Sequence, residues 1–137
     1  MEQLSYAMYG TNSQKIYDEC CNSFGWKQSE RGNFGFRKKL YAKDAAGDGL
    51  SVWFIAHSDW TETNEGDHIN KLGFFCDPII EEYLNNELPS ETDVTNRIIF
   101  AKKKDGNYYF VGVFKVTKKN VRIREYKLLY RTYPFNQ

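Results

Sequence analysis

The chain has 137 residues, a net charge of +1, 41% hydrophobic residues and 27% charged residues. This length and composition suit one globular domain, which we expect to span residues 1–137. No apolar run approaches the roughly 18 residues of a membrane span, and the N-terminus lacks the pattern of a signal peptide. An odd number of cysteines, two of them adjacent, does not indicate a disulfide framework, so we expect reduced thiols, a cytoplasmic location and no membrane partner.

The small net charge hides an uneven distribution along the chain. Residues 1–96 contain eight Lys/Arg and sixteen Asp/Glu, a net charge of −8. Residues 97–137 contain eleven Lys/Arg and only two acidic residues, a net charge of +9. Such asymmetry indicates either a face that binds a polyanion or basic strands that pack beside acidic segments.

The first half of the chain mixes one helix with two strands. Residues 12–24 have helical apolar spacing, with Asn12 or Ser13 as the N-cap. Strands are predicted at 34–42 and 50–56, the second from its apolar, branched and aromatic composition. A polar loop at 57–67 follows.

The second half is predicted to hold a helix and then a β-meander. Asp77 and Pro78 resemble a helix start, which favours a second helix over residues 77–87. Three strands follow, at residues 97–103, 108–117 and 121–130. Asp105-Gly106 between the first two is typical of a type I′ hairpin turn, which needs positive φ. The predicted fold is therefore an α+β domain with two helices on a strongly bent antiparallel sheet or small β-barrel.

Catalytic and metal-binding patterns are weak. His57, His68 and Cys76 lack the paired spacing of zinc ligands, so we expect no metal site. No glycine-rich phosphate loop precedes a helix, and we expect no cofactor. Glu125-Tyr126-Lys127 resembles the Glu-x-Lys half of a PD-(D/E)xK nuclease motif, with Asp105 as the candidate second carboxylate, although Asp105 is better explained by the hairpin turn.

Cations interleaved with aromatic residues form the stronger pattern. Cations bind phosphates through counterion release, and aromatic faces stack on unpaired bases. The alternative is that the aromatic residues only fill the core: both faces of the strand from Tyr108 onward are apolar, which favours a covered sheet. The predicted phosphate-binding residues are Lys102, Lys103, Lys104, Lys118, Lys119, Arg122 and Arg124.

The order of segments resembles the PUA-like superfamily and, within it, the EVE and SRA-type readers of modified bases. The resemblance lies in Ser51–His57, Arg97–Lys102 and Tyr108–Val116, and covers roughly residues 50–130. It implies a small β-barrel with a pocket that holds one base, often flipped out of a duplex. Such modules bind and do not catalyse.

One loop carries the groups that a base pocket needs. Trp60 could stack on a base, while Asp59 and Asn64 could read its edge, with Trp53 and Tyr109 nearby. Trp60 could equally be a packing lid. The sequence therefore predicts a non-catalytic module that binds DNA or RNA. Two alternatives are a small protein-binding inhibitor, as in defence or anti-defence systems, and a metal-dependent nuclease.

Overall fold

The computed structural model describes residues 3–6, 9–24, 38–43, 49–56, 58, 68–83, 96–120 and 122–134. Its elements are, in chain order, β1 (Gln3–Ser5), β2 (Tyr9–Thr11), α1 (Ser13–Phe24), β3 (Lys38–Lys43), β4 (Gly49–Ile55), β5 (His68–Leu72), the 3₁₀ turn η2 (Phe74–Cys76), β6 (Ile79–Tyr83), β7 (Asn96–Lys102), β8 (Tyr108–Lys119), β9 (Ile123–Tyr130) and β10 (Thr132–Pro134). No helix in this part of the chain is long and apolar enough to cross a membrane.

The main sheet is mixed. Its strand order is β3-β4-β7-β8-β9-β6-β5, with β2 also pairing with β8, while β1 and β10 form a separate antiparallel pair. The β4–β7 pair is parallel, which corrects the prediction of an antiparallel sheet. Within the described ranges no pairing joins β3 to β5, so the sheet is open there and the predicted barrel is not closed.

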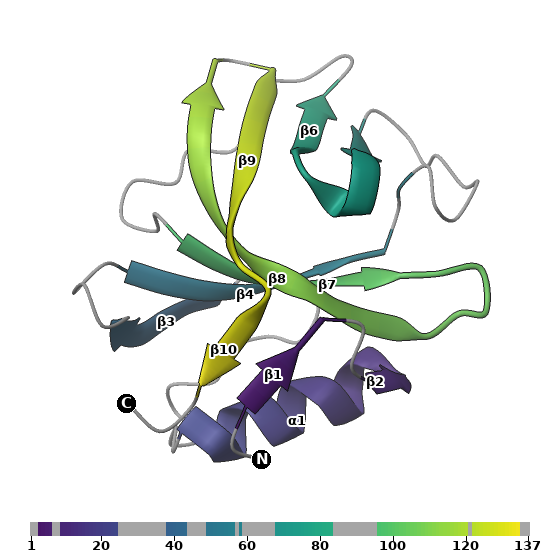
Figure 1. The fold of residues 1–137 in the computed structure, drawn as a ribbon, viewed down its shortest axis with the longest axis vertical. Coiled ribbons are helices and arrows are strands. Elements are labelled where there is room, and N and C mark those ends of the chain that lie inside the picture. Colours follow the sequence, from purple (N-terminus) through teal and green to yellow (C-terminus); the bar gives the residue numbers. More distant parts are fainter. Residues whose placement is uncertain are drawn as a thin grey trace.

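Strand β8 connects the two halves of the sheet. Its first part pairs with β7 and its last part with β9, and both pairings contain register shifts. Such bulges bend a strand. Figure 1 shows β8 crossing the middle of the molecule, with β9 and β6 rising at an angle from β4 and β7. The predicted strong bend is therefore present.

Each face of the central strands packs against its own hydrophobic cluster. Val52, Ile98 and Phe100 face a cluster completed by α1, β1 and β10, which lie together beneath the sheet (Figure 1). Trp53 and Ile99 face the other cluster, which residues of β5, η2, β6 and β9 complete. A parallel pair that is covered on both faces explains the nearly continuous apolar sequence of β4 and β7.

The first predicted helix is confirmed. Helix α1 begins at Ser13. The side chain of Asn12 accepts a hydrogen bond from the backbone N–H of Lys15 at 2.8 Å, as an N-cap does. Ile16 and Tyr17 carry the buried contacts of this helix.

The predicted second helix over residues 77–87 is wrong where the structure describes it, because Ile79–Tyr83 form strand β6. Ile79 is buried in the core, and β6 has hydrogen-bonded neighbours on both sides, β5 and β9. Two β-branched residues and two strand partners outweigh the local signal of Asp77-Pro78. Residues 84–87 lie outside the described ranges.

The hairpin at Asp105-Gly106 is confirmed, but its turn is not type I′. Of these residues only Gly106 has positive φ, at 84°. The N–H of Gly106 donates to the carbonyl of Lys103 at 2.9 Å, and the N–H of Lys103 donates to the carbonyl of Asn107 at 3.0 Å. This pattern is that of a three-residue loop that ends in a glycine bulge.

Candidate functional site

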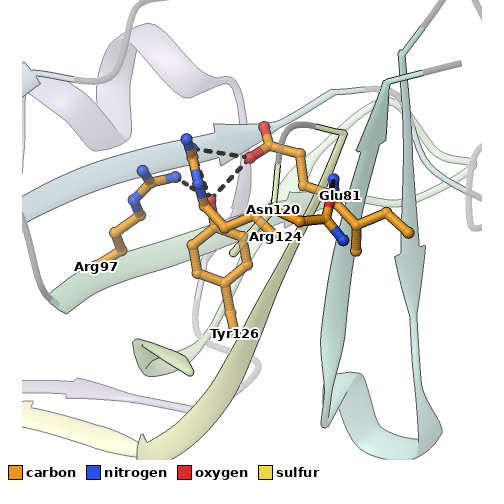
Figure 2. A network of polar contacts seen from close by, with 6 residues as sticks. Glu81, Arg97, Asn120, Arg124 and Tyr126 are labelled. Atoms are coloured by element: carbon orange, nitrogen blue, oxygen red, sulfur yellow. Dashed lines mark hydrogen bonds and ion pairs between the residues drawn. The ribbon is translucent and has the colours of Figure 1, made fainter. Parts of the chain in front are cut away.

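A buried polar network lies between the two halves of the sheet. Glu81 comes from β6, Arg97 from β7, and Arg124 and Tyr126 from β9 (Figure 2). All four side chains are at most 2% exposed. Charged side chains are almost never buried without partners, so the burial of these four side chains depends on their contacts with one another.

The phenol of Tyr126 is the centre of the network. Its hydroxyl donates to Glu81 Oε1 at 2.8 Å and accepts from Arg97 Nη1 at 2.5 Å and Arg124 Nη1 at 3.4 Å. Arg124 Nη1 also lies 3.2 Å from Glu81 Oε1, which forms a buried ion pair. Burial raises the pKa of Tyr126 well above its ordinary value of 10.0, so the phenol stays protonated and acts as a donor to Glu81.

The turn between β8 and β9 places Arg124 in this network. Asn120 Oδ1 accepts from the backbone N–H groups of Arg122 at 2.9 Å and Ile123 at 2.8 Å. This Asx turn sets the start of β9. Figure 2 shows Asn120 beside the network, at the end of the strand that carries Arg124 and Tyr126.

An aromatic wall adjoins the network. The Trp53 ring lies 5.1 Å from the Tyr126 ring, between centroids, at an interplanar angle of 47°. The Arg97 guanidinium carbon lies 5.3 Å from the Trp53 centroid and 4.8 Å from the Tyr126 centroid. These cation–π contacts hold Trp53, which is 7% exposed, in one orientation.

Two buried residues bracket most of the polar loop predicted after β4. Ser58 and Asn70 form an isolated parallel bridge, and both residues are buried. The bridge holds Ser58 beside Asn70, so these two points on either side of the intervening segment lie together. Asp59, Trp60 and Asn64 belong to this segment and lie outside the described residues.

The β7–β8 hairpin forms a basic tip. Lys103 and Lys104 are exposed, and Lys102 is half-buried. The Tyr109 hydroxyl donates to Asp105 Oδ2 at 2.5 Å, and Lys103 Nζ lies 4.5 Å from the Tyr109 ring centroid. The hydrogen bond from Tyr109 lowers the pKa of Asp105 and raises the pKa of Tyr109. These contacts fix the conformation of the tip.

The other predicted site residues fall in different environments. Trp53 on β4 and Tyr109 on β8 lie on strands that are separated by β7. Arg122 is exposed, whereas Arg124 is 1% exposed and paired with Glu81, so it does not present its charge to a phosphate in this structure. Lys118 and Lys119 belong to β8, and their side chains lie outside the described part of the structure.

The carboxylates of the nuclease alternative are far apart. Asp105 lies in the turn before β8, and Glu125 pairs with Lys118 near the other end of that strand. Ten residues of strand correspond to roughly 30 Å, so these two carboxylates cannot share one cation. Glu125 instead accepts a hydrogen bond from the Thr117 hydroxyl at 2.9 Å. In the described residues no group of three or more His, Cys, Asp or Glu side chains could hold a metal ion.

Sequence reasoning missed Glu81, Arg97 and Tyr126 as network residues. A signal was present for the two charged ones. Arg97 directly precedes the apolar run Ile98-Ile99-Phe100, and Glu81 follows Ile79-Ile80. A charged residue within or next to a buried strand indicates a paired internal charge.

Comparison with known proteins gives a likeness in fold. The sequence matches no family model and no curated protein. Among solved structures, AbaSI, a 5-hydroxymethylcytosine-specific restriction enzyme, superposes with a TM-score of 0.64 over 97% of this chain. The chain has the fold of a part of AbaSI. The match covers 42% of AbaSI at 18% sequence identity, so the likeness to AbaSI establishes the fold alone.

Proposed function

We propose that this chain is a non-catalytic, PUA-like module that binds DNA and holds one modified cytosine base. The observation that carries the proposal is the fold likeness over 97% of the chain to an enzyme specific for 5-hydroxymethylcytosine. The resemblance of residues 50–130 to the readers of modified bases, which comes from the sequence alone, supports it as well. Restriction by AbaSI is a property of that longer protein and is not assigned to this chain.

We place the base pocket beside β4, next to the contact between Trp53 and Tyr126. Trp53 and the network centred on Tyr126 form a rigid wall, and the segment that starts at Ser58 carries the groups predicted to contact the base. Trp60 supplies a stacking surface, Asp59 an acceptor and Asn64 an amide. Holding a base out of the duplex requires stacking and edge contacts of this kind.

The basic hairpin tip supports a contact with the DNA backbone. Lys103 and Lys104 are exposed on a turn whose conformation the Asp105–Tyr109 hydrogen bond fixes. A pre-formed tip loses little conformational freedom when it binds. We assign Lys103 and Lys104 as phosphate contacts that position the module while the pocket reads the base.

The base pocket is tested with duplexes that differ at one position. The chain should bind a duplex containing one 5-hydroxymethylcytosine more tightly than the same duplex with cytosine. Trp60→Ala should weaken binding to the modified duplex by about tenfold to a hundredfold, because stacking on one aromatic ring is worth about 1–3 kcal/mol. Fluorescence anisotropy measures both affinities, and thermal melting of the variant is the control.

Equal affinity of the wild type for modified and unmodified duplexes would remove the base-reading part of this proposal. A large fall in melting temperature on Trp60→Ala would show that Trp60 is a core residue, since loss of a buried Trp costs about 3–5 kcal/mol.

The hairpin contact is tested by salt dependence. Lys103→Gln with Lys104→Gln should reduce the slope of log affinity against log salt by about 0.9 for each phosphate that the hairpin no longer neutralises. The matched control is Lys15→Gln with Lys115→Gln, which changes the net charge equally at exposed positions on α1 and β8. An equal reduction of the slope in both double variants would show a general charge effect and contradict the assignment to the hairpin.

A further inference from the structure

Two exposed phenylalanines project from the turn that leads into β6. Phe74 is 85% exposed and Phe75 is 60% exposed, and Figure 1 shows their turn as the short coil next to β6. Their rings meet edge to face, with centroids 4.6 Å apart at an angle of 63°. Exposed apolar side chains that cluster in this way mark interaction sites, because burying them in the domain itself would have been favourable.

The turn holds these rings in a strained backbone conformation. Phe75 has φ 51° and ψ 37°, and Cys76 has φ 60°, which are left-handed values that non-glycine residues rarely adopt. This geometry turns the Phe75 side chain outward while Cys76, fully buried, enters the cluster that contains Trp53 and Tyr126. Strain of this kind persists only where the surroundings impose it, and it concentrates at functional sites.

The surrounding contacts impose the conformation from several sides. Within the turn, the N–H of Cys76 donates to the carbonyl of Gly73 at 2.8 Å, and the N–H of Gly73 donates to the carbonyl of Pro78 at 2.8 Å. A side chain at Gly73 would come within 2.8 Å of that Pro78 oxygen, so the two backbone segments can approach only at glycine.

Arg131 ties the turn to the rest of the sheet. Its guanidinium donates to the Phe75 carbonyl through Nη2 and to the Val111 carbonyl through Nη1 at 2.6 Å. The same guanidinium lies 4.7 Å from the Tyr6 ring centroid. The Asp77 carboxylate accepts the N–H of Leu128 at 3.2 Å, which fixes the other side of the turn to β9.

We propose that Phe74 is an apolar wedge that enters a base step of a bound duplex, with Phe75 as the ring that supports it. Proteins that unstack DNA insert apolar side chains, phenylalanine among them, between base pairs. Phe74 is the more exposed ring and makes an edge-to-face contact with Phe75. Phe74 can therefore enter the base step while the Phe75 ring holds the Phe74 ring in its orientation. Arg131, whose guanidinium contacts the Phe75 carbonyl, provides positive charge at the turn for a phosphate of that step, and the Asp77 carboxylate on the other side of the turn accepts the N–H of Leu128.

The wedge lies next to the strand that also carries the network. Ile79 pairs with Tyr126 and Glu81 pairs with Arg124, so β6 connects the turn directly to the wall beside Trp53. This inference rests on the proposed function in one respect, since it requires that the chain binds a duplex. It assigns a second contact, distinct from both the base pocket and the basic hairpin.

The test compares duplex and single-stranded DNA. Phe74→Ala should weaken binding to a duplex with one 5-hydroxymethylcytosine by about tenfold to a hundredfold, the effect of losing one base–aromatic stack. Affinity for the modified single strand should be unchanged, because no stacked pair has to be opened. A 2-aminopurine placed in turn on each side of the modified base should brighten on binding of the wild type and not of Phe74→Ala.

The control is Tyr130→Ala, which removes an aromatic ring that is 61% exposed and next to Arg131 but leaves the turn intact. Tyr130→Ala should keep both the affinity and the fluorescence change. Melting temperatures of both variants should match that of the wild type, as expected for exposed side chains.

Several outcomes would overturn the wedge. The first is unchanged duplex binding by Phe74→Ala, and the second is an equal reduction of its affinity for duplex and single strand. The third is a change in the oligomeric state of Phe74→Ala on gel filtration, which would make the turn a protein interface. If the wild type binds duplexes without preferring the modified base, the base-reading proposal fails while the Phe74→Ala comparison still decides the wedge. If the wild type binds no duplex, both the proposed function and the wedge are wrong.

Discussion

Replacing Glu81 with alanine should destabilise the fold by about 3–5 kcal/mol, the cost of leaving a buried charge without its partner. In this variant Arg124 loses the carboxylate that lies 3.2 Å away, and the Tyr126 hydroxyl loses its acceptor. Both groups are buried and cannot recover their hydration. Urea unfolding monitored by tryptophan fluorescence gives the free energy directly.

The neighbouring carboxylate provides a matched control. Glu82 lies on the same strand and pairs with Lys71 at 3.5 Å, but the two side chains are 26% and 57% exposed. Glu82→Ala should therefore change stability by at most about 1 kcal/mol. A Glu81→Ala variant within that same range would show that the network contributes little to the fold.

The network is also expected to be replaceable as a unit. Buried ion pairs often add no net stability compared with well-packed apolar residues of similar volume. In a double-mutant cycle, Glu81→Leu and Arg124→Met together should therefore cost less than the sum of the two single changes. The single Glu81→Leu variant should remain strongly destabilised, since it leaves the buried charge of Arg124 without its partner.

Replacing Gly112 with alanine should cost about 2–6 kcal/mol, because two penalties add. Gly112 has φ 146°, which side chains rarely adopt, and such strain costs about 1–3 kcal/mol. A Cβ there would also lie 2.6 Å from Leu128 Cδ1 and 2.8 Å from the carbonyl oxygen of Tyr130. Overpacking of this kind costs about a further 1–3 kcal/mol, and the Tyr130 oxygen is backbone that cannot rotate away.

Gly106→Ala separates the two penalties. Gly106 also has positive φ, at 84°, but a Cβ there would meet no atom within 4 Å. Only the conformational cost of about 1–2 kcal/mol is expected at this position. If the two alanine variants unfold at the same urea concentration, the close approach of β8 and β9 at Gly112 is not as tight as the structure has it.

Features encoded by neighbouring residues can be predicted from the sequence, and those encoded by distant ones cannot. The Asn12 cap and the Asp105-Gly106 hairpin depend on residues within four positions of each other. The sequence predicts a helix where β6 lies because Asp77-Pro78 is a local signal, whereas the partners that make residues 79–83 a strand lie on β5 and β9. The parallel pairing of β4 with β7 likewise cannot be predicted from the residues next to either strand.

The candidate site divides in the same way. The exposed lysines of the hairpin are predictable, because cations beside a turn signal are visible in sequence. Arg124 is predicted to face solvent, since its partner Glu81 lies 43 positions earlier and belongs to a segment predicted as a helix. The sequence does not single out the wedge residues Phe74 and Phe75, because two adjacent phenylalanines are typical of a core and only the backbone conformation turns them outward.

The pairing of β1 with β10 has a consequence for how the chain folds. Gln3 lies opposite Pro134, so almost the whole described chain must be folded back before this ladder can form. Closing so long a loop is entropically costly, and chains dominated by distant contacts fold slowly, in milliseconds to seconds. Leu4 and Tyr133, which this ladder places in the core beside α1, are therefore expected to be buried late, and the apolar surface that they cover is expected to be open to aggregation until then.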